Sequence, residues 1–253
     1  FPVINFDFLI GVPRQNVKKI EKTMEVVGKL KPSQLQTMYV HYKPNTRKYM
    51  TQMVRNEPML DFFDRKAVFE AANKVLMSNN YTRAGFESYA LPNDPLAKSI
   101  SEKKAVYNSL GTQKGEATNF VAVGSSAHGV LNDEYYFQNF YELNLYRGAI
   151  DEGKFPIYRG LKMSADDVIR REVIRHIRTF FNIEFDFFDK KYKMNFKDYF
   201  KRELVNLLPL QDDQLLKINN NNVVLTALGE HLSPQIANVF DVYNDQKFYE
   251  KSA

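Results

Sequence analysis

The N-terminal part of the chain alternates an apolar strand, an amphipathic helix and a second apolar strand. Residues 4–13, INFDFLIGVP, are mostly apolar, contain the single carboxylate Asp7 and end in turn-forming glycine and proline. Asn16 can cap a helix over residues 17–30, whose apolar side chains recur at helical spacing, and residues 35–42, LQTMYVHY, are predicted as the next strand. This order predicts a βαβ unit with parallel strands and a right-handed crossover.

A second apolar run breaks into small residues. Residues 120–129, FVAVGSSAHG, predict a strand whose end is kept small so that a large group can approach the backbone. Strands that alternate with helices favour a parallel or mixed sheet, in which ligands bind beyond the carboxyl ends of the strands. By themselves these features indicate an α/β ligand-binding protein.

The remaining pattern predicts further helices and short strands. We expect a helix at residues 58–77, a short strand or turn at 85–91, a polar helix within 95–110, a flexible loop at 111–118, a strand at 134–139 antiparallel to the strand before it, and a helix at 140–152. Ser164 and Asp167 predict a capping box, after which helices dominate. Helices at 196–208, 212–217 and 231–243, with an Asn-rich hairpin and a strand at 223–226, resemble a helix-turn-helix with a wing. We place a domain boundary between residues 160 and 161, which gives domains 1–160 and 161–253.

Composition excludes several classes of site. The 253 residues are 44% hydrophobic, enough for a buried core, and the net charge of +5 is too mild and too dispersed for a nucleic-acid-binding surface. The chain has no cysteine, so disulfides, thiolate zinc sites and iron–sulfur ligation within it are excluded, and we expect no metal ligands in this chain. No apolar run is long enough to span a bilayer. Because residue 1 lies almost at the start of a strand, we expect that upstream sequence has been lost.

An ordered series of motifs resembles one enzyme family. The opening INFDFLIGVPRQ is similar to the fifth-strand segment of the radical S-adenosylmethionine proteins related to oxygen-independent coproporphyrinogen III oxidase, a family that includes the anaerobic heme chaperones. The resemblance continues, in order, through MYVHYKPNT, GFESYALPNDPLA, FVAVGSSAHG, YYFQNFYELNLY, IYRGLKMSADDVIRREVI, DYFKREL and VVLTALG. Each motif alone is weak, but the ordered series covers almost the whole chain.

The resemblance implies a fold and a reaction. The fold class would be α/β: the C-terminal portion of an incomplete radical SAM (β/α) barrel, followed by a mainly helical domain with a winged-helix-like end. The implied cofactors are S-adenosylmethionine and a [4Fe–4S] cluster, and the implied reaction is oxidative decarboxylation of coproporphyrinogen III propionates to vinyl groups in the cytoplasm. The cofactors would supply the chemistry and the protein would orient them.

The departure from the family is the missing cluster motif. The family binds its cluster through Cys-x-x-x-Cys-x-x-Cys on an early barrel loop, and this chain has no cysteine. We therefore expect a fragment, or a partner of a separate N-terminal barrel half, that is inactive alone. A barrel that begins at its fifth strand would expose an apolar edge, so we also expect the isolated chain to dimerise, to be poorly soluble, or to be rescued by that half.

The resemblance assigns cofactor-contacting positions. Asp7 matches the family's acidic residue that contacts S-adenosylmethionine, although a carboxylate satisfied by a neighbouring loop is the alternative. His41 stands where the family has a small residue beside the cofactor, and a structural histidine is the alternative there. His128 stands at a cofactor-contacting position and resembles the Ala-His of the chaperone branch, while the alternative is an exposed turn residue. Ser109 and Leu110 replace an aromatic residue and a glutamine that contact a second S-adenosylmethionine in true oxidases.

Two further positions match substrate-binding residues of the family. Asn139 and Arg159 are the candidates, and a guanidinium suits a tetrapyrrole propionate because it can bind a carboxylate bidentately. An interdomain salt bridge is the alternative for Arg159. Glu87 and Ser88 replace an acidic residue and a histidine of the oxidase pattern.

Three functions are compatible with the resemblance. The leading hypothesis is part of a coproporphyrinogen III oxidase, the second is a heme-binding chaperone, and the third is an anaerobic heme-degrading methyltransferase. The aromatic run at residues 135–141 could stack on a tetrapyrrole, but an aromatic strand in a core is commoner. Arg170, Arg171, Arg175 and Arg178 could suggest DNA binding, but acidic residues lie among them, so no nucleic-acid partner is expected.

Overall fold

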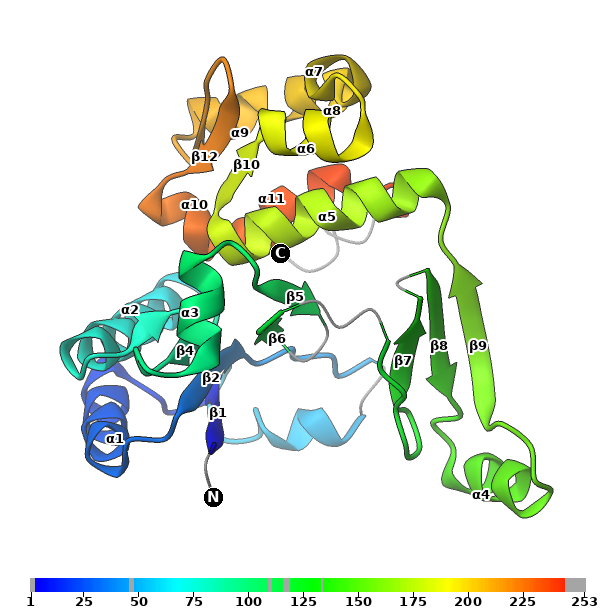
Figure 1. Cartoon of the computed structure of the whole chain (residues 1–253). Helices are drawn as coiled ribbons and strands as arrows, with labels where there is room; N and C mark the ends of the chain where they lie inside the picture. Colours follow the sequence, from blue (N-terminus) through cyan, green and yellow to red (C-terminus); the bar gives the residue numbers. More distant parts are fainter. Residues whose placement is uncertain (1–2, 46–47, 109–110, 116–118, 133, 244–253) are drawn as a thin grey trace.

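The computed structural model describes residues 3–45, 48–108, 111–115, 119–132 and 134–243. The fold is a mixed α/β arrangement in three parts (Figure 1). A four-stranded sheet with helices α1 to α3 forms the first part, a three-stranded sheet with helix α4 stands apart from it as an arm, and a mainly helical C-terminal part lies across the top. In the chain that the structure describes, no helix is long and apolar enough to cross a membrane.

The predicted βαβ unit forms at the N-terminus. Strand β1 (Asn5–Ile10) and strand β2 (Gln34–Tyr39) are parallel and pair in register along their whole length, and helix α1 (Val17–Leu30) connects them. The side chain of Asn16 caps α1 by accepting from the backbone N of Lys19 at 3.0 Å. Lys31 ends the helix in the left-handed conformation, donating its N–H to Val27.

The rest of this sheet runs antiparallel. A 3-10 turn η1 (Lys48–Gln52) and helix α2 (Phe62–Ser78) precede strands β3 (Thr82–Arg83) and β4 (Ser88–Ala90), and the strand order is β1-β2-β4-β3. Helix α2 begins later than the predicted residue 58 because Asp61 caps it, accepting from Asp64 N at 2.8 Å. Helix α3 (Pro95–Ser101) follows, with Asp94 as its cap.

Helices α1 and α2 cover one face of this sheet. The core beneath them consists of Ile10, Ile20, Met24, Val27, Leu35, Val68, Phe69, Ala71, Ala72, Leu76, Tyr81 and Tyr89. Because side chains alternate along a strand, Asp7, Leu9, Gln36 and Met38 lie on the opposite face, which we call the inner face. None of these four residues belongs to a buried core cluster.

A short hairpin lies against the inner face. Strand β5 (Val106–Asn108) pairs antiparallel with strand β6 (Gly111–Gln113). Residues 111–113 are therefore a strand, and the prediction of a loop from residue 111 was wrong for them; residues 116–118 lie outside the described chain. The hairpin is fixed by tertiary contact, since Thr112 N donates to Ser88 Oγ at 3.3 Å and Gly111 lies against the side chain of Gln36.

The arm corrects the prediction for residues 120–129. Strand β7 (His128–Leu131) begins where the predicted strand should end, and before it only Phe120 pairs, in an isolated bridge with Val130. The small residues form a turn before the strand because Gly124 and Ser126 have positive φ values of 110° and 62°. Strand β8 (Tyr135–Asn139) pairs antiparallel with β7, as predicted, and strand β9 (Ile157–Lys162), which was not predicted, completes the sheet. Helix α4 (Leu143–Asp151) closes the arm.

The C-terminal part is built on one long helix. Helix α5 (Ala165–Phe180) carries the predicted capping box, with Ser164 Oγ accepting from Asp167 N at 3.1 Å and Asp167 Oδ2 accepting from Ser164 N at 2.8 Å. The elements that follow are strand β10 (Asn182–Glu184), helices α6 (Phe185–Tyr192), α7 (Phe196–Tyr199), α8 (Lys201–Asn206) and α9 (Leu208–Asp212), strands β11 (Leu216–Ile218) and β12 (Asn222–Leu225), helices α10 (Ala227–His231) and α11 (Ser233–Ala237), and the 3-10 turn η2 (Asn238–Phe240).

Three helix predictions in this part were wrong in extent. The helix predicted at residues 196–208 is divided into α7 and α8 at Phe200. Residues 212–217 are not a helix, because α9 ends at Asp212 and β11 begins at Leu216. The last predicted helix is divided between α10, α11 and η2. Strands β10, β12 and β11 form an antiparallel sheet, closed by the Asn-rich turn in which Asn219 N donates to Asn222 O at 2.8 Å. The winged-helix arrangement and the boundary at residue 160 stay predictions.

Candidate functional site

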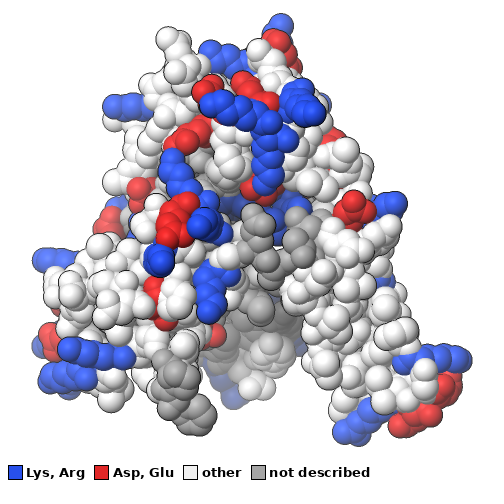
Figure 2. Space-filling view, viewed as in Figure 1, with Lys and Arg blue, Asp and Glu red and all other residues white. Residues whose placement is uncertain are grey.

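The inner face carries the first candidate residue. Asp7 lies on β1 and is exposed, with Asn5 Nδ2 donating to its Oδ1 at 2.6 Å. Its register partner on β2 is Gln36, and the register partner of Gln36 on β4 is Ser88, so three polar side chains form one row across the sheet. Figure 2 shows the molecule hollowed between the block that contains this sheet and the arm. Asp7 is the exposed end of this row, whereas Ser88 is 1% exposed, so a polar ligand group could reach the row at Asp7.

His41 lies close to the carboxyl ends of the two parallel strands. Strand β1 ends at Ile10 and β2 ends at Tyr39, and Val40 N donates to Ile10 O at 2.9 Å, which holds the two ends together. His41 follows directly, exposed and outside the strand. Strand β2 is thus shorter than the predicted residues 35–42, and His41 stands on the loop beyond the sheet, at the edge where ligands of parallel strands bind.

Glu87 lies beside the row of polar residues, between β3 and β4. Its backbone carbonyl accepts from Thr37 N at 2.8 Å, and Tyr107 Oη donates to its Oε1 at 3.4 Å. Burial raises the pKa of the Glu87 carboxyl, Asp7 raises it further, and Arg178 and the Tyr107 hydroxyl lower it. The burial effect is the largest, so this carboxyl holds its proton more readily than an exposed glutamate does.

Tyr107 joins Glu87 to the C-terminal part. Arg178 Nη2 donates to Tyr107 Oη, and the guanidinium of Arg178 stacks over the Tyr107 ring with its Cζ 4.4 Å from the ring centroid. Burial raises the pKa of Tyr107 to about 12, so its hydroxyl stays protonated at neutral pH. Ser109 and Leu110, the predicted contacts for a second cofactor, lie outside the described residues. An aromatic residue followed by an amide, Tyr107 and Asn108, does stand just before them.

Asn139 holds the small-residue turn of the arm. It is 4% exposed, and its Nδ2 donates to Gly124 O at 3.0 Å and to Ala122 O at 3.4 Å. Its backbone N donates to Ala127 O at 2.8 Å. The amide nitrogen of this predicted substrate-binding residue is therefore used to shape the loop that precedes His128.

His128 and Arg159 share one row of the arm. His128 pairs with Gln138 across β7 and β8, and Gln138 pairs with Arg159 across β8 and β9. Two strand spacings put their backbones roughly 10 Å apart. Gln138 Oε1 accepts from Arg159 Nε at 2.9 Å and Gln138 Nε2 donates to Ser126 O at 3.2 Å, while both outer side chains are exposed. Within the chain that the structure describes, Arg159 makes no salt bridge, so the interdomain pair that was the alternative is not formed there.

The four arginines of α5 point into the fold. Arg170 binds Asp166 Oδ2 at 2.7 Å and Glu203 Oε1 at 2.8 Å. Arg171 donates to Tyr136 Oη at 3.5 Å, Arg175 Nε donates to Tyr107 O at 3.2 Å, and Arg178 contacts Tyr107 as described. These side chains connect α5 to its neighbours and do not form a basic outer surface.

The donor set suits one of the two expected cofactors. Carboxylate, amide and hydroxyl oxygens on the inner face can bind the hydroxyl or ammonium groups of a ligand such as S-adenosylmethionine. A [4Fe–4S] cluster does not fit this chain, because it has no cysteine. Among the residues that the structure describes, no group of three or more His, Asp or Glu side chains could hold a metal ion.

Sequence reasoning missed the connection between Glu87, Tyr107 and Arg178. The three residues come from a loop, a short strand and a helix that are far apart in the sequence, so no spacing pattern marks them. In the sequence, Glu87 stands out only as a replacement in the oxidase pattern, and Arg178 only as one of four arginines. A signal was present in the helical spacing of Arg171, Arg175 and Arg178, which places the three on neighbouring positions of one helix side.

Comparison with known proteins confirms the resemblance. The chain is 29% identical over 252 residues to the oxygen-independent coproporphyrinogen III oxidase of Helicobacter pylori (strain ATCC 700392 / 26695) and 28% identical over 247 residues to that of Escherichia coli (strain K12), each match covering 98% of this chain and 54% of the relative. The chain therefore spans about half the length of these curated relatives. Residues 163–230 match the family model of the HemN C-terminal domain.

A solved structure agrees with the sequence comparison. The fold matches that of coproporphyrinogen III oxidase (HemN) from Escherichia coli, described as a radical SAM enzyme, with a TM-score of 0.85 and 26% sequence identity. The match covers 95% of this chain and 55% of the solved chain. The relatives in both comparisons thus carry the name coproporphyrinogen III oxidase, and the one with a solved structure is described as a radical SAM enzyme.

Proposed function

Since this chain is related over nearly its whole length to the C-terminal part of oxygen-independent coproporphyrinogen III oxidases, we propose that it acts as part of a radical SAM enzyme of tetrapyrrole metabolism. The reaction it would serve is the oxidative decarboxylation of coproporphyrinogen III propionates to vinyl groups, which gives protoporphyrinogen IX. The observation that carries this proposal is the fold match to the radical SAM enzyme along almost the entire chain. We further propose two domains, 1–160 and 161–253, and a cytoplasmic location.

The inner face would contact the cofactor. When bound, S-adenosylmethionine supplies the hydrogen-abstracting radical chemistry. Asp7 would accept hydrogen bonds from the cofactor's hydroxyl or ammonium groups, because it is exposed and its Oδ2 is left available when Oδ1 accepts from Asn5 Nδ2. His41 would lie at the edge of the same ligand, beyond the ends of β1 and β2. Ser109 and Leu110 stay candidates for a second cofactor contact.

The arm would contact the tetrapyrrole. Arg159 is exposed, and its Nε donates to Gln138 Oε1. This hydrogen bond orients the guanidinium, so its two terminal nitrogens can bind a ligand. A propionate suits such a group because two parallel hydrogen bonds can form. Asn139 would act through the loop whose carbonyls it binds, and His128 would face the ligand from the first position of β7.

The cluster would have to come from other sequence. Strand β1 is the edge of its sheet. An open groove of about 860 Å³ lies along β1 and is lined by β1 and by α1 residues that include Val26 and Leu30. A free strand edge beside apolar side chains is suited to a further strand and helix. We propose that a cluster-binding barrel half adds at this edge, and that the chain alone is inactive.

The test uses the whole gene product that contains this chain, purified anaerobically. Iron content and S-adenosylmethionine cleavage are measured first, followed by turnover of coproporphyrinogen III. The vinyl product is expected, with the variant Asp7→Asn losing cofactor cleavage and Arg159→Met losing turnover while it retains cleavage. A protein that holds a cluster and cleaves the cofactor without forming a vinyl group would contradict the oxidase proposal.

A heme-binding chaperone is the second candidate, and exposed His128 is the observation that favours it. An imidazole at the start of β7, in one row with Arg159, could approach heme iron while the guanidinium binds a propionate. The chaperone function predicts one heme per chain without turnover, and loss of that stoichiometric heme in His128→Ala. Heme binding that is unchanged in this variant would exclude His128 as the ligand.

A further inference from the structure

The end of helix α5 is attached to two segments beside the inner face. Phe86 N donates to Arg178 O at 2.9 Å, which fixes the segment that leads into Glu87. Gly85 allows this approach, because a Cβ there would lie 2.9 Å from Arg178 O, and other residues rarely adopt its φ of +84°. Arg175 Nε holds β5 by donating to Tyr107 O at 3.2 Å. Hydrogen bonds thus attach the C-terminal part to the sheet next to the candidate cofactor site.

The Arg178 side chain fills the gap between these segments. Its Cζ lies 4.9 Å from the ring centroid of Phe86 and 4.4 Å from that of Tyr107, so the guanidinium is held between two aromatic rings. Its Nη2 donates to Tyr107 Oη, and that hydroxyl in turn donates to Glu87 Oε1. Because the guanidinium is planar and rigid, its stacking and its hydrogen bond together fix both the ring and the hydroxyl of Tyr107.

The charge of Arg178 is available to Glu87. In the part of the chain that the structure describes, no carboxylate forms a salt bridge with Arg178. The groups that face Glu87 are Asp7 from β1, Tyr107 from β5 and Arg178 from α5. Burial and Asp7 favour the neutral carboxyl, whereas Arg178 and Tyr107 favour the carboxylate. Arg178 belongs to α5, and Tyr107 is bound by Arg175 and Arg178 of the same helix, so both favourable contacts are connected to α5.

We propose that Arg178 is a positioning residue, which acts through Tyr107 to orient Glu87 and to favour its carboxylate form beside the inner face. The docking of the C-terminal part would thereby complete the charge of the cofactor site, and a carboxylate there favours a ligand that carries a positive charge. The assignment of that ligand as S-adenosylmethionine rests on the proposed function. The coupling of Glu87 to Arg178 is independent of the proposed function, because it rests on the contacts between these residues.

The first test reads Glu87 directly. The side-chain carboxyl of Glu87 is followed by ¹³C NMR across pH in the wild-type chain, in Arg178→Met, in Arg178→Lys and in Tyr107→Phe, with exposed Arg202→Met as the control. The Glu87 midpoint should rise by roughly one pH unit in Arg178→Met, rise less in Tyr107→Phe, and return towards wild type in Arg178→Lys. A midpoint that is the same in all variants would overturn the inference, and Tyr107→Phe and Arg178→Lys keep this readout available if Arg178→Met does not fold.

The second test reads the consequence for a cationic ligand. Binding of S-adenosylmethionine is measured by calorimetry at several pH values. Arg178→Met should bind several-fold more weakly below its new Glu87 midpoint and regain affinity when the pH is raised above that midpoint, whereas Glu87→Gln should stay weak at every pH. A loss that pH does not reverse would mean that Arg178 has only a structural role, which overturns the proposal. A wild-type protein that binds no S-adenosylmethionine would contradict the proposed function, while the NMR titration still decides the coupling.

Discussion

His176 shows how burial outweighs a nearby opposite charge. Its Nε2 lies 3.8 Å from Glu172 Oε1, which favours the imidazolium, but the rings of Phe180, Phe187 and Phe188 surround it with centroids 4.6 to 5.2 Å away. Burial is the larger effect and lowers the pKa of His176 to about 4. The histidine is therefore neutral in the folded protein at neutral pH.

This neutral state predicts acid sensitivity. His176 binds its proton less readily in the folded chain than in the unfolded one, so its contribution to the unfolding free energy is complete above pH 6.5 and is lost as the pH falls towards 4. His176→Phe should remove up to roughly 3 kcal/mol of this loss. Urea unfolding at pH 7, 5.5 and 4.5 measures it. The same pH dependence in His176→Phe as in wild type would contradict the burial argument; exposed His128→Gln is the control.

At the scale of elements, two helical glycines differ in what surrounds them. A Cβ at Gly229 in α10 would overlap the backbone carbonyl of Leu215, whereas a Cβ at Gly148 in α4 would have no atom within 4 Å. Helix α10 carries Glu230, which binds Arg83 at 2.6 Å, and His231, which lies 3.4 Å from Glu70. The close approach at Gly229 thus sets the position of a helix that joins the C-terminal part to α2 and β3.

Alanine at the two positions should have opposite effects. Gly229→Ala should lower the unfolding free energy by roughly 1–3 kcal/mol, because backbone must move to accept the methyl group. Gly148→Ala should raise it by about 0.5–1 kcal/mol, because alanine loses less conformational freedom in an exposed helix. Thermal unfolding of the two variants beside wild type measures both. Equal effects of the two substitutions would show that α10 shifts freely and is not fixed by Leu215.

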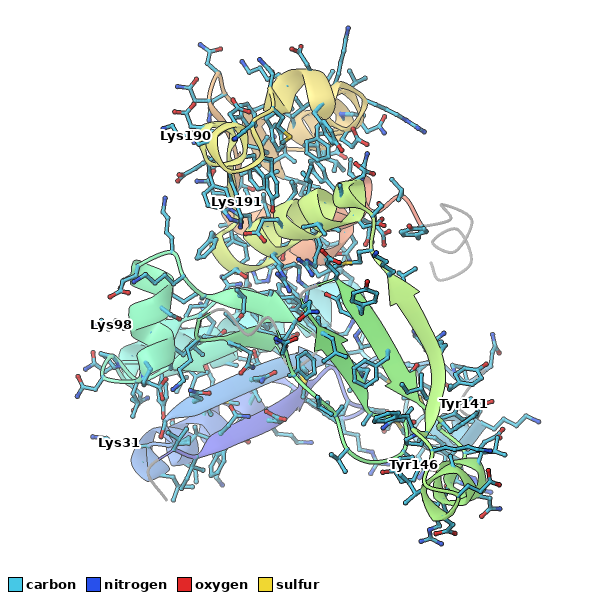
Figure 3. All side chains as sticks on the ribbon, turned by 45° about the vertical axis from the view of Figure 1, so that its right-hand side comes forward. Lys31, Lys98, Tyr141, Tyr146, Lys190 and Lys191 are labelled. Atoms are coloured by element: carbon cyan, nitrogen blue, oxygen red, sulfur yellow. The ribbon has the colours of Figure 1, made fainter. Side chains whose placement is uncertain are left out.

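At the scale of the whole molecule, apolar side chains are exposed at two separate edges. Val26 and Leu30 of α1 are 50% and 64% exposed beside the free edge of β1. In the arm, Tyr141 is 60% exposed and lies next to α4 with Tyr146, far from Lys190 and Lys191 of the C-terminal part (Figure 3). Exposed large side chains at an edge are typical of contact sites.

The free edge predicts association of the isolated chain. The double variant Val26→Lys, Leu30→Lys should weaken concentration-dependent association in sedimentation velocity, since it places charge beside the unpaired strand. Leu228→Lys, a change of the same kind at a position that is 41% exposed in α10, is the matched control and should leave association unchanged. Association that persists in the double variant but is lost on substitution of Tyr141 would place the contact on the arm.

Local sequence determined the elements that depend on neighbouring residues. Helix α1 between Asn16 and Lys31, the βαβ order and the capping box of Ser164 with Asp167 could be predicted, because caps and helical periodicity act within a few residues. The resemblance supplied Asp7, His41, His128, Asn139 and Arg159 as candidates, and their functions stay predictions.

Only the tertiary structure decided the rest, because it depends on contacts between distant residues. Residues 111–113 form a strand because Thr112 binds Ser88 and Gly111 packs against Gln36. The turn before β7 is held by Asn139, which lies more than a dozen positions after Gly124 in the sequence. The link from Arg178 through Tyr107 to Glu87 joins three elements that no local pattern relates. Sequence determined which residues could carry charge near a ligand, and packing decided which of them share one site.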